Sequence, residues 1–359
     1  MNRGRLILFL GLTLILFNCT FAPETFTVET IDGVRHVHNI APKWGDEQKI
    51  SLEFVHKIGE LESDDEDIIF YNPNDIGIDD DGNYYVLDTG NYRVVKFDKN
   101  LNHLLTFGSK GQGPGEFLFP RNIHIDATGN IFVNDFRNKR ISVFDKEGNY
   151  KKTIKENFNP HTMRMLSSGE IAIYDISPAG AENVDKSGLI SILDHDGNII
   201  RRIGKRRIYE ESIMNLQGNV VTFALDNRDN IYITYIVRNR IDKYSPEGKF
   251  LMQISRELPY PEDDTIIQGK LINSFSNGIQ VDGKGRIWVG TPRVQLGEDI
   301  PAGESSYWLE IYDNNGVLLE RLQNENYNYG CYMKITDDRM FIIETDKEMA
   351  VFEYRIVER

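Results

Sequence analysis

Apolar and polar residues alternate along short segments of this chain, and one arrangement of these segments recurs. Each clear copy has an apolar-x-apolar-Asp segment, a turn and an apolar-aromatic-apolar segment, as in IHIDATGNIFV from Ile123. Gly, Asn or Asp between two alternating runs predicts a β-hairpin, because these residues adopt positive φ at little cost. Clear copies start at Ile76, Ile123, Phe223 and Ile279, and degenerate copies start at Met163 and Met333. The recurrence predicts a repeat protein of six units.

Two further strands follow most of the hairpins, as in VVKFD and then HLLTFG after the first. Each unit therefore reads as a four-stranded antiparallel meander, which cannot bury both of its faces alone. Units that stack and close into a ring leave no exposed end, so the sequence predicts an all-β, six-bladed β-propeller. The sixth unit supplies only three strands, and residues 51–59 (SLEFVHKIG) resemble the fourth strands of other units. We expect this N-terminal strand to pair with the C-terminal blade and close the ring.

Two segments carry a family resemblance. VLDTGNYRVVKFD at 86–98 and FGSKGQGPGEFLFPRNIHID at 107–126 are similar to the NHL-repeat six-bladed β-propeller pattern, with its D-x-x-N-x-R-hydrophobic strand end and Gly-rich turn. The match is close in the first two units, partial in the fourth and poor in the others. The chain also resembles bacterial exported or lipid-anchored propellers. The resemblance implies the fold, but propellers host unrelated activities.

The N-terminus has the form of an export signal. Arg3 and Arg5 precede an apolar run at 6–17 that is too short to span a membrane. Residues 16–19 (LFNC) resemble a bacterial lipobox, which predicts lipidation of Cys19, although Asn18 replaces the usual small residue. The alternative is an ordinary signal peptide cut near Ala22, with Cys19 incidental.

This interpretation divides the chain into three parts. They are a signal peptide, a lipid-anchored lead-in with a small hairpin at Asp32 and Gly33, and the propeller, at 1–18, 19–49 and 50–359. We expect an exported, membrane-anchored lipoprotein of the bacterial cell envelope, facing the periplasm or the cell surface. We expect it to be a monomer.

The charge and the cysteine content of the chain limit the kinds of partner and of stabilisation that we expect. Lys and Arg number 41 against 55 Asp and Glu, a net charge of −14, which disfavours nucleic-acid binding. Cys19 and Cys331 are the only cysteines, so no disulfide framework is expected and packing must supply the stability.

Two features of the sequence suggest a metal site and a phosphate-binding loop, but both are better explained as ordinary structure. His36 and His38 alternate on one predicted hairpin strand without a third metal ligand nearby, which is typical of surface residues. The Gly-rich residues 108–115 lack the Gly-Lys-Ser/Thr of a phosphate loop and lead into a strand, so we interpret them as a crossing between blades.

Long loops predict the binding face. In a propeller, the turns before the innermost strand and between the second and third strands lie on one face, around the channel mouth. Insertions at 176–187, 205–217, 256–274 and 292–306 all lengthen this face, and insertions concentrated on one face indicate binding. Aligning the blades brings eight candidate ligand-binding residues to the mouth, namely Asn74, Asp75, Arg121, Asn122, Arg137, His161, Asn277 and Tyr332.

Tyrosines from the insertions add to this polar, mixed-charge rim. Tyr209, Tyr260 and Tyr307, the last beside Trp308, are expected near the mouth. Aromatic groups with donors and acceptors suit a sugar, a peptide or a protein loop. The recurrent aspartates are instead expected to cap turns. They are Asp79, Asp126, Asp226 and Asp282, together with Asp88 and Asp135, for which Arg93 and Arg140 are candidate ion-pair partners between blades.

Three functions fit these residues. We favour a non-enzymatic propeller that binds an envelope protein, peptide or glycan on the loop face. The alternative is a metal-dependent (Ca or Zn) lyase or lactonase, because the resemblance extends to such propellers, but the mouth offers only His161 and, inside a strand, His124. A calcium site from Asn74, Asn122, Asn277 and Asp75 is conceivable. A sensor would need a separate signalling partner. The sequence assigns no catalytic residue, metal ligand or cofactor.

Overall fold

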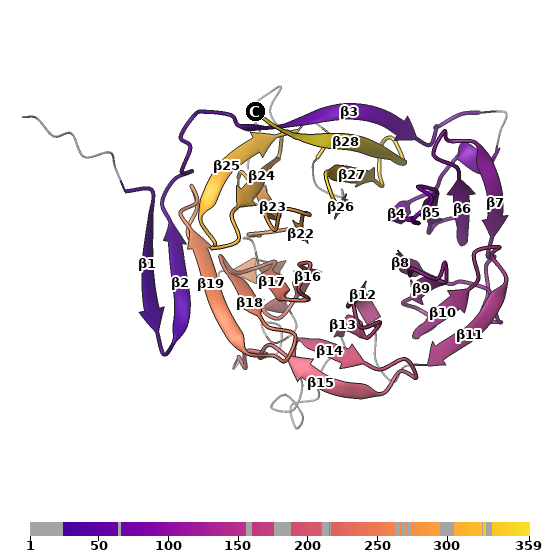
Figure 1. The fold of residues 1–359 in the computed structure, drawn as a ribbon, viewed down its shortest axis with the longest axis horizontal. Coiled ribbons are helices and arrows are strands. Elements are labelled where there is room, and N and C mark those ends of the chain that lie inside the picture. The colour runs from indigo at the N-terminus through magenta and orange to yellow at the C-terminus, as the bar shows by residue number, and fades with distance from the viewer. Residues whose placement is uncertain are drawn as a thin grey trace, which may run out of the picture.

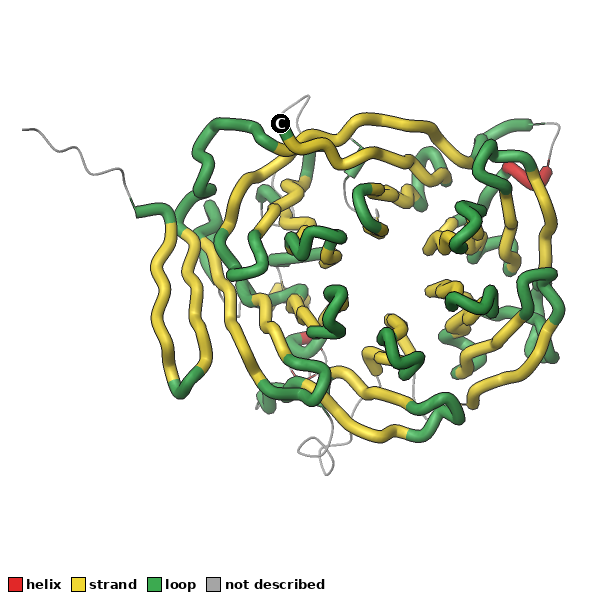
Figure 2. The backbone as a smooth tube through the Cα atoms, in the orientation of Figure 1, coloured by secondary structure: helices red, strands yellow, loops and turns green. Residues whose placement is uncertain are grey.

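The computed structural model describes residues 24–359 apart from 64–65, 156–159, 176–187, 210–214, 216, 263–265, 268–269, 272–273, 295–304, 325 and 328–331. Cys19 and Cys331 lie outside the described residues, as do the 176–187 loop and most of the 292–306 loop. Six β-sheets stand around a central channel, and one strand of each sheet lies innermost, beside the channel (Figure 1). The smooth trace in Figure 2 shows that strands and connecting turns make up nearly all of the ring.

The blades are regular antiparallel meanders. Blades 1 to 3 comprise β4 (Pro73–Ile78), β5 (Tyr84–Asp88), β6 (Arg93–Phe97) and β7 (His103–Phe107); β8 (Pro120–Ile125), β9 (Ile131–Asp135), β10 (Arg140–Phe144) and β11 (Tyr150–Lys155); and β12 (Pro160–Met165), β13 (Ile171–Asp175), β14 (Ile190–Leu193) and β15 (Ile199–Ile203). Blades 4 and 5 comprise β16 (Val221–Leu225), β17 (Ile231–Tyr235), β18 (Ile241–Tyr244) and β19 (Phe250–Arg256); and β22 (Gly278–Val281), β23 (Ile287–Pro292), β24 (Tyr307–Tyr312) and β25 (Leu318–Gln323). The predicted six-bladed fold is confirmed.

Blade 6 draws its outer strand from the other end of the chain. It comprises β26 (Tyr332–Thr336), β27 (Arg339–Glu344), β28 (Ala350–Glu358) and β3 (Ile50–Ile58). β3 pairs antiparallel with β28, from Val351 opposite Ile58 to Glu358 opposite Ile50. This is the closure expected from residues 51–59, and it joins the two ends of the ring through a ladder of backbone hydrogen bonds.

The lead-in forms the expected hairpin, but the sequence did not predict where it docks. β1 (Phe26–Ile31) and β2 (Val34–Asn39) pair across the turn at Asp32 and Gly33, and β2 then adds in parallel to β19 (Figure 1). Blade 4 is therefore six-stranded. Asn39 joins it to blade 5, because its side chain donates to Gly316 O at 3.0 Å and accepts from Leu318 N at 2.7 Å.

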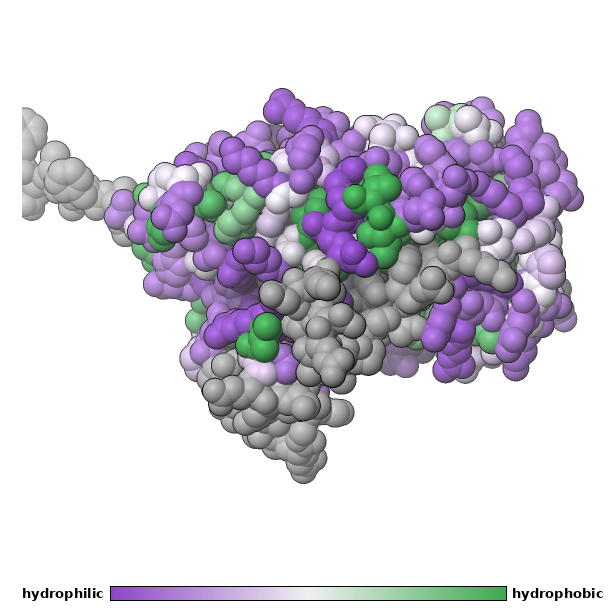
Figure 3. Space-filling view, turned by 90° about the horizontal axis from the view of Figure 1, so that it is seen from below, coloured by the Kyte–Doolittle hydropathy of each residue, from purple (hydrophilic) through white to green (hydrophobic). Residues whose placement is uncertain are grey.

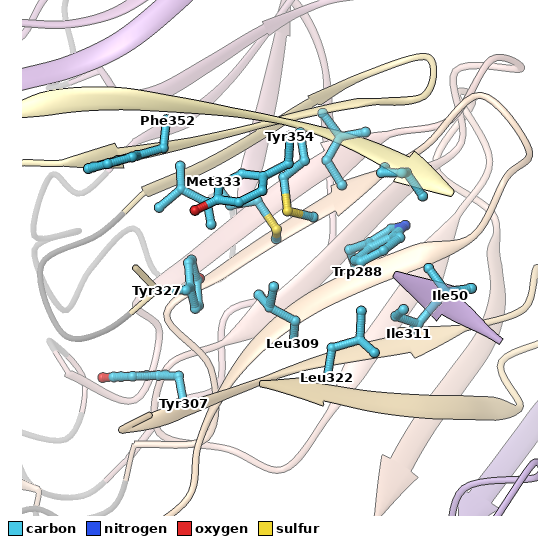
Figure 4. Close-up of a cluster of buried hydrophobic side chains, with 14 of the residues drawn as sticks. Ile50, Trp288, Tyr307, Leu309, Ile311, Leu322, Tyr327, Met333, Phe352 and Tyr354 are labelled. Atoms are coloured by element: carbon cyan, nitrogen blue, oxygen red, sulfur yellow. The ribbon is translucent and has the colours of Figure 1, made fainter. Parts of the chain in front are cut away.

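Apolar side chains fill the spaces between neighbouring blades. Figure 4 shows one such cluster, in which Trp288 and Leu309 of blade 5 face Met333 and Tyr354 of blade 6. All four are buried. Removing apolar surface from water stabilises the ring by about 25 cal/mol per Å². The side of the disc in Figure 3 is mostly hydrophilic, with apolar residues only in small patches.

The recurrent aspartates cap turns, as predicted. In blade 1, Asp79 Oδ1 accepts hydrogen bonds from the backbone N–H groups of Asp81 and Asn83. Asp126, Asp226 and Asp282 repeat the arrangement in blades 2, 4 and 5. These carboxylates fix the hairpins and are not free for a ligand.

The two predicted ion pairs have different outcomes. Arg93 Nε lies 2.8 Å from Asp88 Oδ2, so this ion pair forms, but it lies within blade 1 and not between blades as predicted. Arg140 instead donates to the carbonyl groups of Gln112, Gly113 and Glu116. The 108–115 segment is therefore a blade crossing held by an arginine, which agrees with its interpretation as structure. Asp135 accepts hydrogen bonds from the backbone N–H groups of Leu118 and Phe119, which follow this segment.

Candidate functional site

A cavity of about 80 Å³ opens at the channel mouth, among the first residues of the innermost strands. Its lining includes seven of the eight residues expected there, which are Asn74, Asp75, Arg121, Asn122, His161, Asn277 and Tyr332. Arg137 is exposed and lies outside this lining, with its guanidinium 5.2 Å from the Phe119 ring centre. Tyr260 and Tyr307 are buried instead of forming a rim, and the Tyr260 hydroxyl donates to Pro292 O.

The strand register arranges the channel residues in two layers. Equivalent positions near the start of each innermost strand form the mouth layer, which consists of Asp75, Asn122, Thr162, Thr222, Gly278 and Tyr332. Side chains of a strand alternate between its two sides, so positions two residues later belong to the same side. They form a deeper layer of Gly77, His124, Arg164, Ala224, Gln280 and Lys334.

The deeper layer contains two cations that the sequence reasoning missed. Arg164 and Lys334 fall in the two degenerate copies, MRMLSSG and MKITDDR, so the mouth alignment stopped before them. The available signal was a basic residue between two methionines or between methionine and isoleucine. A charged residue at the centre of a predicted inner strand requires an explanation, because buried charges are costly unless paired.

Lys334 is paired, and its partner is the one carboxylate of the cavity lining. Its ammonium lies 3.0 Å from Asp75 Oδ1 and 3.2 Å from Ile123 O. Asp75 also accepts from the backbone N–H groups of Ile76 and Ile123. Burial lowers the pKa of Lys334, and the Asp75 carboxylate opposes this shift. The pair thus links blades 6, 1 and 2 and neutralises itself.

Arg164 and Arg121 have no carboxylate at ion-pair distance among the residues that the structure describes. Arg164 donates to Met163 O at 2.8 Å. Arg121 lies over the Phe119 and Phe136 rings at 5.7 and 5.9 Å and interacts with the Tyr332 hydroxyl. Burial lowers the pKa of both guanidinium groups, yet arginine remains charged in proteins. Removing one partner of a buried ion pair costs about 3–5 kcal/mol, so unpaired arginines are an expensive feature.

The two channel histidines do not add to this charge. Burial, reinforced by the Arg121 guanidinium, lowers the pKa of His161 to about 3. Burial and then the Lys334 ammonium lower the pKa of His124 to about 4. Both imidazoles are therefore neutral near pH 7. The lining carries two cations, Arg121 and Arg164, against the single carboxylate of Asp75, which is itself paired with Lys334, in a chain whose net charge is −14.

The oxygen atoms at the mouth do not suit a metal ion. Asn122 Oδ1 already accepts from Met163 N and Asn134 Nδ2, and Asn277 Oδ1 accepts from the Tyr327 hydroxyl at 2.6 Å. Asp75 is occupied by Lys334 and two backbone N–H groups. Within the described ranges, no three His, Cys, Asp or Glu side chains come close enough to hold a metal. Of the four groups named for the conceivable calcium site, Asp75, Asn122 and Asn277 thus already have hydrogen-bond partners, and Arg121 and Arg164 in the same lining oppose a cation.

Comparison with models of known protein families shows which family the chain belongs to. A family model described as 6-bladed beta-propeller (DUF5128) matches residues 43–255, more than half of the sequence. The chain belongs to this family. A second model, described as Two component regulator propeller, matches residues 270–293. These matches establish a six-bladed propeller, whereas the narrower NHL-repeat assignment stays a prediction.

Solved structures share this propeller at low identity. A protein from Bacteroides fragilis NCTC 9343, named as an exported protein, has a TM-score of 0.60 at 13% identity, covering 86% of this chain and 95% of its own. Virginiamycin B lyase from Staphylococcus aureus gives 0.52 at 11%, covering 86% and 100%. A gluconolactonase from Xanthomonas campestris gives 0.52 at 13%, covering 87% and 96%. Such identities show the fold alone.

No curated protein sequence matches the chain. In the part of the chain that the structure describes, no helix is long and apolar enough to cross a membrane.

Proposed function

We propose that this protein is a binding propeller of the bacterial cell envelope, anchored through a lipid on Cys19. It holds a protein, peptide or glycan ligand on the loop face around the central channel. The observation that carries this proposal is the convergence of hydrogen-bonding side chains from all six blades on one cavity. Rigid strand ends position these groups before a ligand arrives, which lowers the cost of binding.

A lyase or lactonase is the alternative. It is favoured by the shared fold of virginiamycin B lyase and the gluconolactonase. A metal-dependent reaction would need free donor atoms at the mouth, and the carboxylate and two of the three amide oxygens named for that site are already engaged. Binding is therefore the first function to test.

The test is a triple substitution at the mouth, Arg121→Ala with His161→Ala and Tyr332→Ala. Full-length protein and this variant would be compared on immobilised glycans and peptides of defined composition. The matched control is Arg355→Ala, because Arg355 is exposed on β28, away from the cavity lining. We expect the triple variant to fold normally and lose binding, and the control to bind as the wild type does. Full binding by the triple variant would place the site elsewhere. Wild-type protein that binds none of the immobilised glycans or peptides would overturn the proposed binding function.

The lipid anchor has a separate test. Cys19→Ser removes the thiol that would carry the lipid, while the alternative signal cleavage near Ala22 remains available. We expect the wild-type protein to partition with membranes and to take up radiolabelled palmitate, and the variant to be released as soluble protein. Identical partitioning of both forms would support the ordinary signal peptide.

A further inference from the structure

We propose that the ligand of the channel mouth is an acidic saccharide, whose carboxylate enters the cavity and neutralises Arg121 and Arg164. This inference rests on the proposed binding function and names its ligand class. The cavity of about 80 Å³ has room for a group of a few heavy atoms, so the remainder of the ligand lies above the mouth.

The charge of the cavity requires an anion. Asp75 forms an ion pair with Lys334 at 3.0 Å, and its charge also attracts Arg164, so one carboxylate faces three cations. Neither Arg121 nor Arg164 has a carboxylate at ion-pair distance among the described residues. Guanidinium groups bind carboxylates through parallel N–H donors and are weakly hydrated, so they suit this role at a partly buried position. The acidic remainder of the protein repels anions that approach elsewhere, so the channel is a localised positive site.

The neutral groups around the cavity favour a sugar as the carrier of that anion. Asn74, Thr162 and Thr222 offer amides and hydroxyls, and the Thr222 hydroxyl has no hydrogen-bond partner in the described structure. Tyr332 stands at the mouth with 39% of its surface exposed, next to Arg121. An exposed aromatic ring can stack on the C–H face of a pyranose while its hydroxyl forms hydrogen bonds.

A peptide carboxylate is the competing source. A peptide with a free C-terminus would use the same arginines, but its side chains would need apolar pockets of their own. The mouth layer instead presents polar side chains and one glycine around the ring. The binding experiment therefore also tests a tripeptide with a free C-terminus.

The decisive probe is trigalacturonate, with its fully methyl-esterified form as the matched control. Esterification keeps the sugar rings and removes only the negative charges. Calorimetric titration of the full-length protein in detergent should show binding of the acid and about 10- to 100-fold weaker binding of the ester. Binding of the acid should also weaken as salt is raised, because salt screens charge attraction. Equal binding of acid and ester, or binding of a tripeptide with a free C-terminus but not of trigalacturonate, would overturn the inference.

Two variants separate a ligand role from a structural role. Arg164→Met and Arg121→Gln remove charges that form no ion pair with a described carboxylate. Each should weaken trigalacturonate binding about tenfold or more, while the melting temperature changes little. Arg355→Gln, exposed on β28 and away from the channel lining, is the control. A lower melting temperature with unchanged binding would assign the arginines to structure and overturn the proposal.

The two proposals fail in different ways. If the mouth variants abolish binding of some neutral glycan or peptide while trigalacturonate never binds, the binding function stands and the acidic-sugar inference fails. If trigalacturonate and every other probe bind equally to wild-type and mouth-variant protein, the channel is not the site and both fail.

Discussion

Arg256 and Arg164 are both arginines of the propeller interior, but only Arg256 has a carboxylate. Arg256 and Glu310 are fully buried between blades 4 and 5, with Arg256 Nε 2.6 Å from Glu310 Oε2. Arg321 Nε lies 2.9 Å from the other carboxylate oxygen. Burial raises the pKa of Glu310, but the two arginines outweigh this effect and hold it below its usual value.

The surroundings of Arg256 complete the contrast. Thr291 and Tyr312 donate hydroxyl hydrogen bonds to Glu310, and Arg256 donates to Phe275 O and Asn239 Oδ1. Where an arginine serves the fold, the chain thus supplies its counter-ion and its acceptors. Arg164 and Arg121 line a cavity, and neither has a carboxylate at ion-pair distance among the described residues. The difference teaches that the missing counter-ion in the channel belongs to a ligand.

Removing the internal counter-ion should have the largest effect. Glu310→Gln leaves Arg256 buried next to a neutral group, which should lower the free energy of unfolding by about 3–5 kcal/mol. Urea unfolding measures this loss. The control is Glu53→Gln, whose exposed pair with Arg355 should contribute about 0–1 kcal/mol. Equal losses in the two variants would show that the counter-ion of Arg256 has no special importance.

Acid should release a second internal pair, at the ring closure. Burial raises the pKa of Glu353, but hydrogen bonds from His56, Arg339 and Tyr84 and the Arg339 charge outweigh it and lower the value from 4.5 to about 2. A depressed pKa stabilises the fold above the unfolded-state value and loses this contribution as pH falls. The contribution is about 3 kcal/mol, lost between about pH 4.5 and 2.

Unfolding of wild type and Glu353→Gln across this range checks the closure. The wild-type protein should lose stability steeply with acid, whereas the variant should start lower and depend less on pH. Parallel pH profiles would mean that other carboxylates govern acid unfolding.

Placing a carboxylate inside the channel tests the same comparison, because it gives Arg164 the kind of counter-ion that Arg256 already has. Gln280 belongs to the same layer as Arg164 and Lys334, and Gln280→Glu adds a carboxylate of nearly the same shape. It loses one hydrogen bond to Met333 O, so we expect a stability change within about 1 kcal/mol. Calorimetry should show trigalacturonate binding weakened about tenfold or more, because the site is already neutralised. Unchanged binding would separate the ligand from this layer.

Chelation should have the smallest effect. The oxygens of Asp75, Asn122 and Asn277 are engaged, so EDTA should leave the melting temperature of the purified protein unchanged. Elemental analysis of the same sample is the parallel measurement. If one metal ion were bound per protein molecule and its removal lowered the melting temperature, the lyase or lactonase alternative would be favoured over binding.

Repetition explains how much of this molecule could be predicted from its sequence. The turns after Asp79 and Asp126 repeat one chemistry, so the blade boundaries and the mouth positions such as Asn74 and Arg121 followed from alignment. The closing strand was recognisable because it resembles other fourth strands. These are local patterns that every blade shares.

What could not be predicted depends on differences between blades. The docking of β2 on β19 depends on Asn39 meeting blade 5, a contact between residues 39 and 316. Arg164 and Lys334 each stand in one of the two degenerate copies of the hairpin signature, and no other blade has an Arg or Lys at the equivalent position. Tyr260 was assigned to the rim because it lies in an insertion, yet its hydroxyl is bonded to buried backbone. Residues that break the repeat must be placed by tertiary contacts, and these include the two deeper-layer cations, Arg164 and Lys334.

A crystal structure of the protein with trigalacturonate tests the central claim most directly. The account predicts a carboxylate in the channel cavity, within hydrogen-bond distance of the Arg121 or Arg164 guanidinium and with a sugar ring against Tyr332. A sugar bound on the outer strands, with no anion in contact with either arginine, would contradict it.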